Sequence, residues 1–205
     1  MTIEYRDGTG SKPLLASKLS RQRIRAVLRH APPAMNLRDP PLRPAAVLMP
    51  IVDREEPTLL FTRRTEHLPS HAGQVCFPGG RRHGDDETLI QTALREMQEE
   101  IGLAPESVEV AGFLDCYETL NTGFLILPVV GFLSDGFQLS VNPHEVAEIF
   151  EAPLAFVLDP KNHMHKFAER GGVMREFYAI QYRDHTIWGA TAAMIVNLSE
   201  RLGFA

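Results

Sequence analysis

The stretch GGRRHGDDETLIQTALREMQEEIGL, residues 79–103, decides the fold because it joins a glycine-rich turn to a strongly periodic helix. Asp85 or Asp86 is a suitable helix N-cap, and Gly102 is a suitable left-handed stop after Ile101. Between these ends, apolar residues recur at the spacing of one helix face: Leu89, Ile90, Ala93, Leu94, Met97 and Ile101. The pattern predicts an amphipathic helix that packs on a core through this face.

Three carboxylates crowd another face of the predicted helix. Glu96, Glu99 and Glu100 fall within an arc of roughly 100°, where like charges cost a few tenths of a kcal/mol per pair. A solvated acidic face is one interpretation. A site for Mg²⁺ or Mn²⁺ is the other, because hard cations prefer oxygen ligands. Arg95, which could orient a carboxylate, and the glycine pair before the helix, which allows close approach of a phosphate, favour the metal site.

The rest of the chain predicts an α/β domain with a mixed sheet. Apolar runs predict strands at 45–52, 58–64, 74–77, 107–119 and 124–133, and strands within 166–189 that turn at Gly171-Gly172. Helical spacing predicts helices at 17–30, mostly through 144–159, and at 190–202. The elements lack a regular βαβ rhythm, which favours a mixed sheet over a doubly wound one. Residues 1–44 are expected to form an arm, a helix and a proline-rich connection, and residues 45–205 the domain.

Composition limits the classes of partner. The 205 residues are 44% hydrophobic with a net charge of −5, so no global basic field recruits nucleic acid or an anionic membrane. The arginines of the helix at 17–30 are interpreted as a solvated face. No apolar run reaches the ~18–20 residues of a membrane span. Cys76 and Cys116 form no disulfide framework, and a reduced, cytoplasmic setting is expected.

The glycine pair and the acidic helix together resemble the signature of the Nudix hydrolases, G-x5-E-x7-R-E-U-x-E-E-x-G-U, where U is aliphatic. The second half matches at Arg95, Glu96, Met97, Glu99, Glu100, Gly102 and Leu103. The loop in the first half is one residue longer. Counted from Gly80, the first glutamate of the signature falls on Asp86, and counted back from Arg95 it falls on Glu87.

This resemblance implies an α/β/α sandwich and hydrolysis of a nucleoside diphosphate linked to another moiety. It also implies that Glu96, Glu99 and Glu100 hold the divalent ions, aided by the carbonyl of Gly80. The general base varies in this family. Glu99 is the first candidate and Glu145, in the segment NPHEVAE, is the second. Homodimers are frequent in the family, so a homodimer is a possible assembly.

Residues 59–80, LLFTRRTEHLPSHAGQVCFPGG, resemble the motif of the coenzyme A pyrophosphatases within that family. The pair Leu59-Leu60, Gly73 and the run 77–80 match the motif. Arg64-Thr65 stands for its Arg-Ser pair, and Pro69 stands in place of its second Arg. This implies cleavage of coenzyme A to 3′,5′-ADP and 4′-phosphopantetheine. The alternatives are ADP-ribose, a dinucleotide or a nucleoside triphosphate as substrate, or a non-catalytic nucleotide-binding module.

Nearby residues are candidates for substrate contacts. Four arginines could bind the phosphates and one aromatic ring could stack on a base: Arg63, Arg64, Arg81, Arg82 and Phe77.

Overall fold

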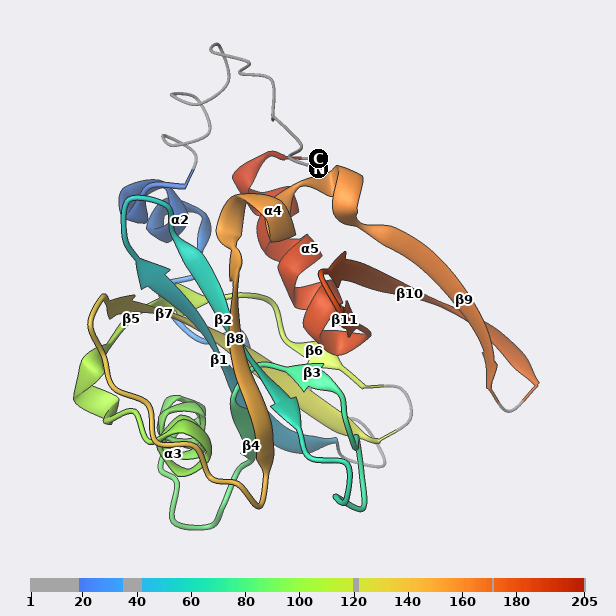
Figure 1. Ribbon diagram of the computed structural model, residues 1–205, viewed down its shortest axis with the longest axis horizontal. Coiled ribbons are helices and arrows are strands. Elements are labelled where there is room, and N and C mark those ends of the chain that lie inside the picture. Colours follow the sequence, from blue (N-terminus) through green and yellow to red (C-terminus); the bar gives the residue numbers. More distant parts are fainter. Residues whose placement is uncertain (1–18, 35–41, 120–121, 171, 205) are drawn as a thin grey trace, which may run out of the picture.

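Figure 1 shows a computed structural model, which describes residues 19–34, 42–119, 122–170 and 172–204. The predicted arm at 1–16, the start of the helix at 17–30, part of the proline-rich connection and Gly171 lie outside these residues. No helix in the described ranges is long and apolar enough to cross a membrane.

A mixed sheet of eight described strands forms the centre of the protein. Its main path runs β3-β2-β1-β7-β5, and β4, β6 and β8 pair with β1, β7 and β2. The long strands β1 and β7 are parallel over their whole lengths, and the other pairs are antiparallel. The bounds are β1 Arg43–Asp53, β2 Thr58–Arg64, β3 Val75–Cys76, β4 Gly79–Arg81, β5 Val108–Phe113, β6 Tyr117–Glu118, β7 Phe124–Ser134 and β8 Val146–Pro153. The predicted mixed sheet is confirmed.

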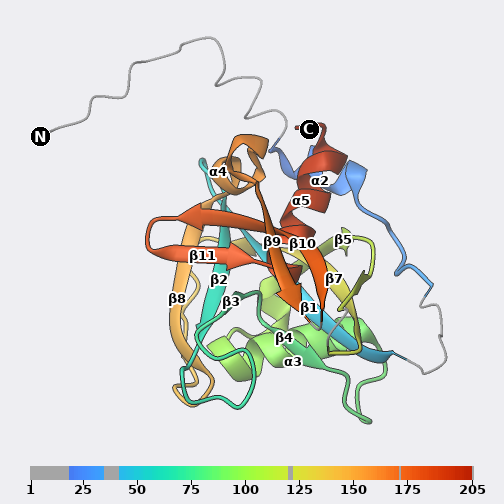
Figure 2. The same ribbon diagram turned by 90° about the vertical axis from the view of Figure 1, so that its right-hand side faces the viewer.

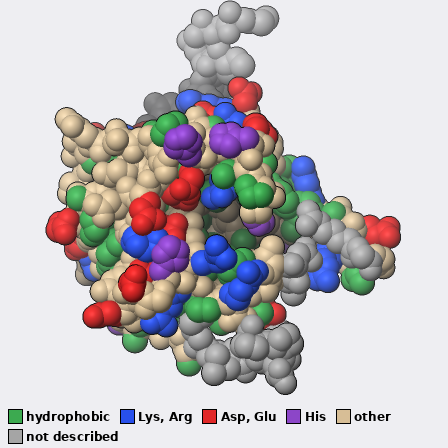
Figure 3. All heavy atoms as spheres, turned by 90° about the horizontal axis from the view of Figure 1, so that it is seen from below, with side chains coloured by type: hydrophobic (Ala, Val, Ile, Leu, Met, Phe, Trp, Pro, Cys, Tyr) green, Lys and Arg blue, Asp and Glu red, His purple; other side chains and the backbone are tan. Residues whose placement is uncertain are grey.

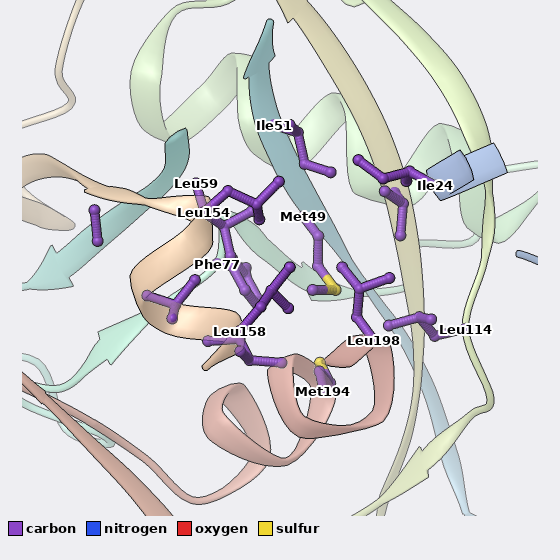
Figure 4. Packing of buried hydrophobic residues seen from close by; sticks show 14 of the residues in the cluster. Ile24, Met49, Ile51, Leu59, Phe77, Leu114, Leu154, Leu158, Met194 and Leu198 are labelled. Atoms are coloured by element: carbon purple, nitrogen blue, oxygen red, sulfur yellow. The ribbon is translucent and has the colours of Figure 1, made fainter. Parts of the chain in front are cut away.

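Helices cover both faces of this sheet, which gives the predicted α/β/α sandwich. Helix α3 (Leu89–Ile101) lies on one face; α2 (Arg21–Val27), α4 (Leu154–Leu158) and α5 (Ala190–Leu202) lie on the other. Alternate residues of β1 serve the two layers, because successive side chains of a strand point to opposite faces. Leu48 packs with the α3 residues, whereas Met49 and Ile51 pack with the α5 residues, as Figure 4 shows for Met49, Met194 and Leu198.

A second, three-stranded antiparallel sheet follows α4 and a short 3-10 turn, η2 (Pro160–Asn162). It consists of β9 (Met164–Arg170), β10 (Val173–Tyr182) and β11 (His185–Trp188). Figure 2 shows this sheet crossing in front of the main one, with the β10–β11 turn beside β8. The strands expected within 166–189 are thus confirmed, and the sheet forms one wall of a cavity described below.

The segment 144–159, expected to be mostly helical, is instead a strand followed by the short helix α4. Strand β8 pairs antiparallel with β2, from Thr58 opposite Pro153 to Arg64 opposite Val146. Pairing with an open strand edge outweighs a weak local helical period, because it satisfies the backbone and buries one face. The helix prediction for this segment was therefore wrong.

Other element boundaries shift by a few residues. Helix α3 begins at Leu89 with Thr88 as its N-cap, not at Asp85 or Asp86. The strand expected at 107–119 divides into the 3-10 turn η1 (Pro105–Ser107), β5 and β6. Strand β5 has a bulge between Val110 and Gly112, which locally disrupts pairing with β7. The last helix begins and ends where the sequence placed it, at Ala190 and Leu202.

Candidate active site

The local sequence of α3 fixes where its carboxylates lie. Thr88 and Gln91 form a capping box, in which each side chain bonds the other residue's backbone N–H. Gly102 ends the helix at φ 73°, a left-handed conformation that glycine adopts without strain. With both ends fixed, the apolar face packs on β1, and the acidic face meets β4 and the loop before β8.

Arg95 lies at the centre of the acidic face. Its Nε and Nη2 donate to the two oxygens of Asp86, each at 3.0 Å. Its Nη1 donates to Glu96 Oε1 at 2.8 Å and to Glu99 Oε2 at 2.9 Å. A further bond from Nη2 to the Arg81 carbonyl, at 3.2 Å, ties the guanidinium to the end of β4. Arg95 thus joins the loop of Asp86 and the end of β4 to helix α3.

Asp86, not Glu87, occupies the position of the first glutamate of the signature, which counting along the sequence left open. Asp86 is 6% exposed and also accepts from the backbone N–H of His83 and the hydroxyl of Thr92, each at 2.9 Å. These bonds, that from Arg95 foremost, hold the pKa of Asp86 below its usual range. The side chain of Glu87 is exposed, and its carbonyl accepts from Arg82. Counting in the sequence could not separate the two acids, whereas their burial does.

Glu100 is the most deeply buried of the three helix glutamates, at 2% exposed. Its Oε2 has no hydrogen-bond partner among the described residues, and the nearest cation, Arg64 Nη1, is 3.8 Å from Oε1. Burial, together with the nearby charges of Glu96 and Glu145, raises the pKa of Glu100 to about 8. A divalent cation would satisfy the unpartnered oxygen and favour the ionised form.

Glu96 and Gly80 lie in direct contact. A Cβ atom on Gly80 would be 2.4 Å from the carboxyl carbon of Glu96, so only glycine allows β4 to approach the carboxylate this closely. Burial raises the pKa of Glu96, which the hydrogen bond from Arg95 partly offsets. The backbone of β4 and the Glu96 carboxylate therefore lie side by side, as they would have to in order to bind the same cation.

Glu145 reaches the same site from the loop before β8. Its charge contributes to the raised pKa of both Glu96 and Glu100, so the three carboxylates lie within electrostatic reach of one another. Asn142 Nδ2 donates to Glu145 Oε1 at 3.2 Å, and the Thr65 N–H donates to the Glu145 carbonyl at 3.0 Å. The loop is thereby fixed to the end of β2.

Within the described ranges, no three His, Cys, Asp or Glu side chains are gathered closely enough to hold a metal ion as they stand. Mutual repulsion separates unbridged carboxylates, and Arg95 holds two of the glutamates in the arrangement observed. The donor set nevertheless suits a hard cation. Its oxygens are all carboxylates or backbone carbonyls, one of them is buried without a partner, and a glycine leaves the space open.

The five residues expected to contact substrate lie in different surroundings. Arg64 faces Glu100, and Arg81 is exposed at the end of β4. Arg82 donates to the carbonyls of Asp86 and Glu87, so it shapes the loop. Figure 3 shows this face, where acidic and basic side chains are mixed around a hollow.

Two of the five point away from the acidic helix. Arg63 Nε donates to Glu148 at 3.0 Å on the other side of the sheet. Phe77 is 2% exposed and stacks on Phe61 at 5.1 Å, so its ring is part of the core and is not available to stack on a base. The group formed by Arg63, Glu148 and His185 was not foreseen from the sequence, because it joins three strands and 85 and 37 positions separate its members.

Comparisons with known proteins identify the family of this chain. The model of the NUDIX domain family matches residues 41–169. The uncharacterized Nudix hydrolase NudL of Photorhabdus laumondii is 44% identical over 162 residues, which cover 78% of this chain and 85% of that protein. Its namesake from Yersinia enterocolitica is 44% identical over 158 residues, covering 77% and 80%. A solved MutT/nudix family protein from Enterococcus faecalis is 13% identical with a TM-score of 0.49, covering 97% of this chain and 75% of that one. The chain belongs to the Nudix hydrolase family.

Proposed function

We propose that this protein uses Mg²⁺ or Mn²⁺ to hydrolyse the pyrophosphate bond of a nucleoside diphosphate derivative, with coenzyme A or one of its derivatives as substrate. The observation that carries the proposal is the buried, unpartnered Oε2 of Glu100 beside two further carboxylates, Glu96 and Glu145. Leaving a buried carboxyl oxygen without a partner is costly, and a bound cation would remove that cost.

The proposal assigns roles to the residues of the acidic helix and to the turn before it, and Glu99 has two of them. Glu96, Glu99 and Glu100 hold the cation, with the carbonyl of Gly80 as a further ligand. Arg95 positions Glu96 and Glu99 and keeps the loop of Asp86 against the helix. When bound, a divalent cation places positive charge against the diphosphate oxygens and makes water easier to deprotonate.

The general base takes the proton of the attacking water. We assign this role to Glu99, whose side chain is 53% exposed and therefore open to substrate and water. Glu145 is the second candidate, because it reaches the same carboxylates from the opposite loop.

The substrate assignment rests on residues 59–80, which form β2, the loop after it, β3 and β4, and so border Glu100 and Glu96. Pro69 is exposed in that loop, so the position of the second Arg of the coenzyme A pyrophosphatase motif carries no guanidinium in this chain. ADP-ribose, dinucleotides and nucleoside triphosphates are the alternative substrates. We also propose a cytoplasmic location and a homodimer.

The first experiment is turnover of a panel of diphosphates by the purified protein with Mg²⁺ or Mn²⁺. We expect coenzyme A to be cleaved faster than ADP-ribose. Glu99→Gln should lower kcat by about 10²- to 10⁴-fold, and Glu145→Gln by less. Glu106→Gln, an exposed carboxylate in η1, is the matched control and should leave kcat unchanged. An unchanged rate in Glu99→Gln would contradict the assignment of the base.

Metal binding is tested separately from turnover by thermal unfolding. Saturating Mn²⁺ should raise Tm in the unaltered protein, because a ligand that binds only the folded state stabilises it. Glu100→Gln should lose most of that rise, while Glu106→Gln keeps it. A rise in Tm without cleavage of any substrate would favour the alternative, a non-catalytic nucleotide-binding module on this fold.

A further inference from the structure

A cavity of about 410 Å³ lies across β2 from the acidic helix. Its walls come from the end of β2, the loop before β3 and the start of β11, and its lining includes Arg63, Gln74, Asp184, His185 and Trp188. Its volume is within the range of small-molecule sites, roughly 300–1,000 Å³. None of the groups proposed to hold the cation lines it.

The charged groups of one wall neutralise each other. Glu148 accepts from Arg63 Nε at 3.0 Å, and its other oxygen is 3.1 Å from His185 Nε2. The hydrogen bond from Arg63 holds the pKa of Glu148 below its usual range, so this carboxylate stays ionised at neutral pH. His185 also stacks on Phe150, with ring centroids 3.8 Å apart. Because Arg63 is paired and Asp184 adds a negative charge, the cavity favours a neutral ligand over a phosphate.

The groups that remain suit a flat heteroaromatic ring with donors and acceptors on its edge. Trp188 supplies an aromatic wall. Asp184 makes no hydrogen bond or ion pair with other residues that the structure describes, and its carboxylate can accept from an exocyclic amine. Gln74 uses its Oε1 with His71 at 2.8 Å, which leaves its amide N–H groups for a ring nitrogen. Adenine presents both an exocyclic amine and ring-nitrogen acceptors.

The cavity and the acidic helix meet at the end of β2. Arg63 lines the cavity, and Arg64, the next residue, faces Glu100. The side chains of these neighbours point to opposite faces of the sheet, so a nucleotide with its diphosphate at the helix has to pass around the end of this strand to reach the cavity. Residues 72–74 of the loop after β2 line the cavity.

We propose that the cavity binds the adenine base of the substrate, with Asp184 accepting from the exocyclic amine and Gln74 donating to a ring nitrogen. The inference rests on the proposed function in one respect, namely that the diphosphate of the substrate binds at the acidic helix. It concerns residues that take no part in holding the cation, so it can be tested without metal and without turnover.

Trp188 is the only tryptophan in the chain, so its fluorescence reports directly on this cavity. AMP and IMP, which differ in the exocyclic group of the base, are titrated without metal, with excitation at the red edge of tryptophan absorption. We expect AMP to change the emission saturably and to bind about fivefold more tightly than IMP, as one hydrogen bond would provide. Asp184→Asn should remove the preference, and Glu55→Gln, an exposed carboxylate in the β1–β2 turn, should retain it.

The inference would be overturned by no change of emission with AMP, by equal binding of AMP and IMP by the unaltered protein, or by a preference that survives in Asp184→Asn. A response to 4′-phosphopantetheine without a response to AMP would also reject it, because the cavity would then hold the other half of coenzyme A. A preference for AMP without hydrolysis of any diphosphate would support the adenine site and reject only the proposed function.

Discussion

Asp86 receives two of the hydrogen bonds that Arg95 makes with carboxylates, although the Nudix signature has a glutamate in this part of the loop. An aspartate is one methylene shorter than a glutamate. The loop between Gly80 and Arg95 is one residue longer than the signature, and the additional residue lets the backbone bring the shorter carboxylate to the guanidinium. Chain length in the loop thus compensates for side-chain length.

Removal of the Asp86 charge tests this compensation. Because Asp86 is buried and Arg95 would lose its main partner, Asp86→Asn should destabilise the protein by about 2–4 kcal/mol and lower kcat. Glu87→Gln, the matched change at the neighbouring exposed acid, should alter neither by a measurable amount. Urea unfolding and steady-state kinetics provide the two measurements. An equal loss in both variants would reject the assignment of Asp86.

At the scale of elements, α3 depends on its own sequence, whereas β8 depends on a neighbour. The capping box of Thr88 and Gln91 and the left-handed Gly102 fix both ends of α3 through contacts no more than four residues apart. Strand β8 pairs with β2 across more than eighty residues of chain. The residues within and next to α3 therefore account for the helix, whereas the residues within β8 alone do not account for the strand.

The cap of α3 can be tested without altering the carboxylates. Thr88→Ala removes the acceptor for the Gln91 N–H and should cost about 1 kcal/mol of stability. Thr88→Ser retains the hydroxyl and should cost less than half as much. The value of kcat should stay within about twofold in both, because Glu96 lies two turns further along the helix. A larger loss of kcat in Thr88→Ala, measured at a temperature where the variant is still folded, would contradict this expectation.

For the whole molecule, ion pairs fasten the two ends of the described chain to the sheet. Asp115, which follows β5, pairs with Arg29 after α2 and with Arg201 of α5. Arg201 also donates to the Val27 carbonyl at 2.9 Å. The segment before the domain and the last helix are therefore joined through one carboxylate.

The ion pairs of Asp115 with Arg29 and Arg201 predict that the stability of the protein depends on pH. The hydrogen bond from Arg201 is the main cause that lowers the pKa of Asp115 below its usual 3.8. A lowered folded-state pKa gives stability that is present above 3.8 and is lost as the pH falls below it. Asp115 is about half exposed, so Asp115→Asn should cost only roughly 1 kcal/mol at pH 7. The difference in Tm between the two proteins should shrink as the pH falls below 3.8, since Asp115 then becomes protonated in the folded protein as well. A constant difference across this range would show that packing, not charge, carries the effect.

Much of the site could be predicted from the sequence, because it lies on one helix. The spacing of Glu96, Glu99 and Glu100 and the stop at Gly102 follow from local helical geometry, and the structure places Gly80 against Glu96. The family followed from the same residues. The strands followed from short apolar runs, because strand formation shows in local periodicity, and the mixed sheet followed from the absence of a regular βαβ rhythm.

Only the tertiary structure decided what depends on burial and on pairing between distant segments. It placed Asp86 rather than Glu87 on Arg95, put Phe77 in the core, and made β8 a strand. It also joined Arg63, Glu148 and His185 beside a cavity that no motif had indicated. The spacing of side chains on a helix is set by the helix itself. Burial and strand pairing depend on residues that are distant in the sequence, so a local sequence pattern does not predict them.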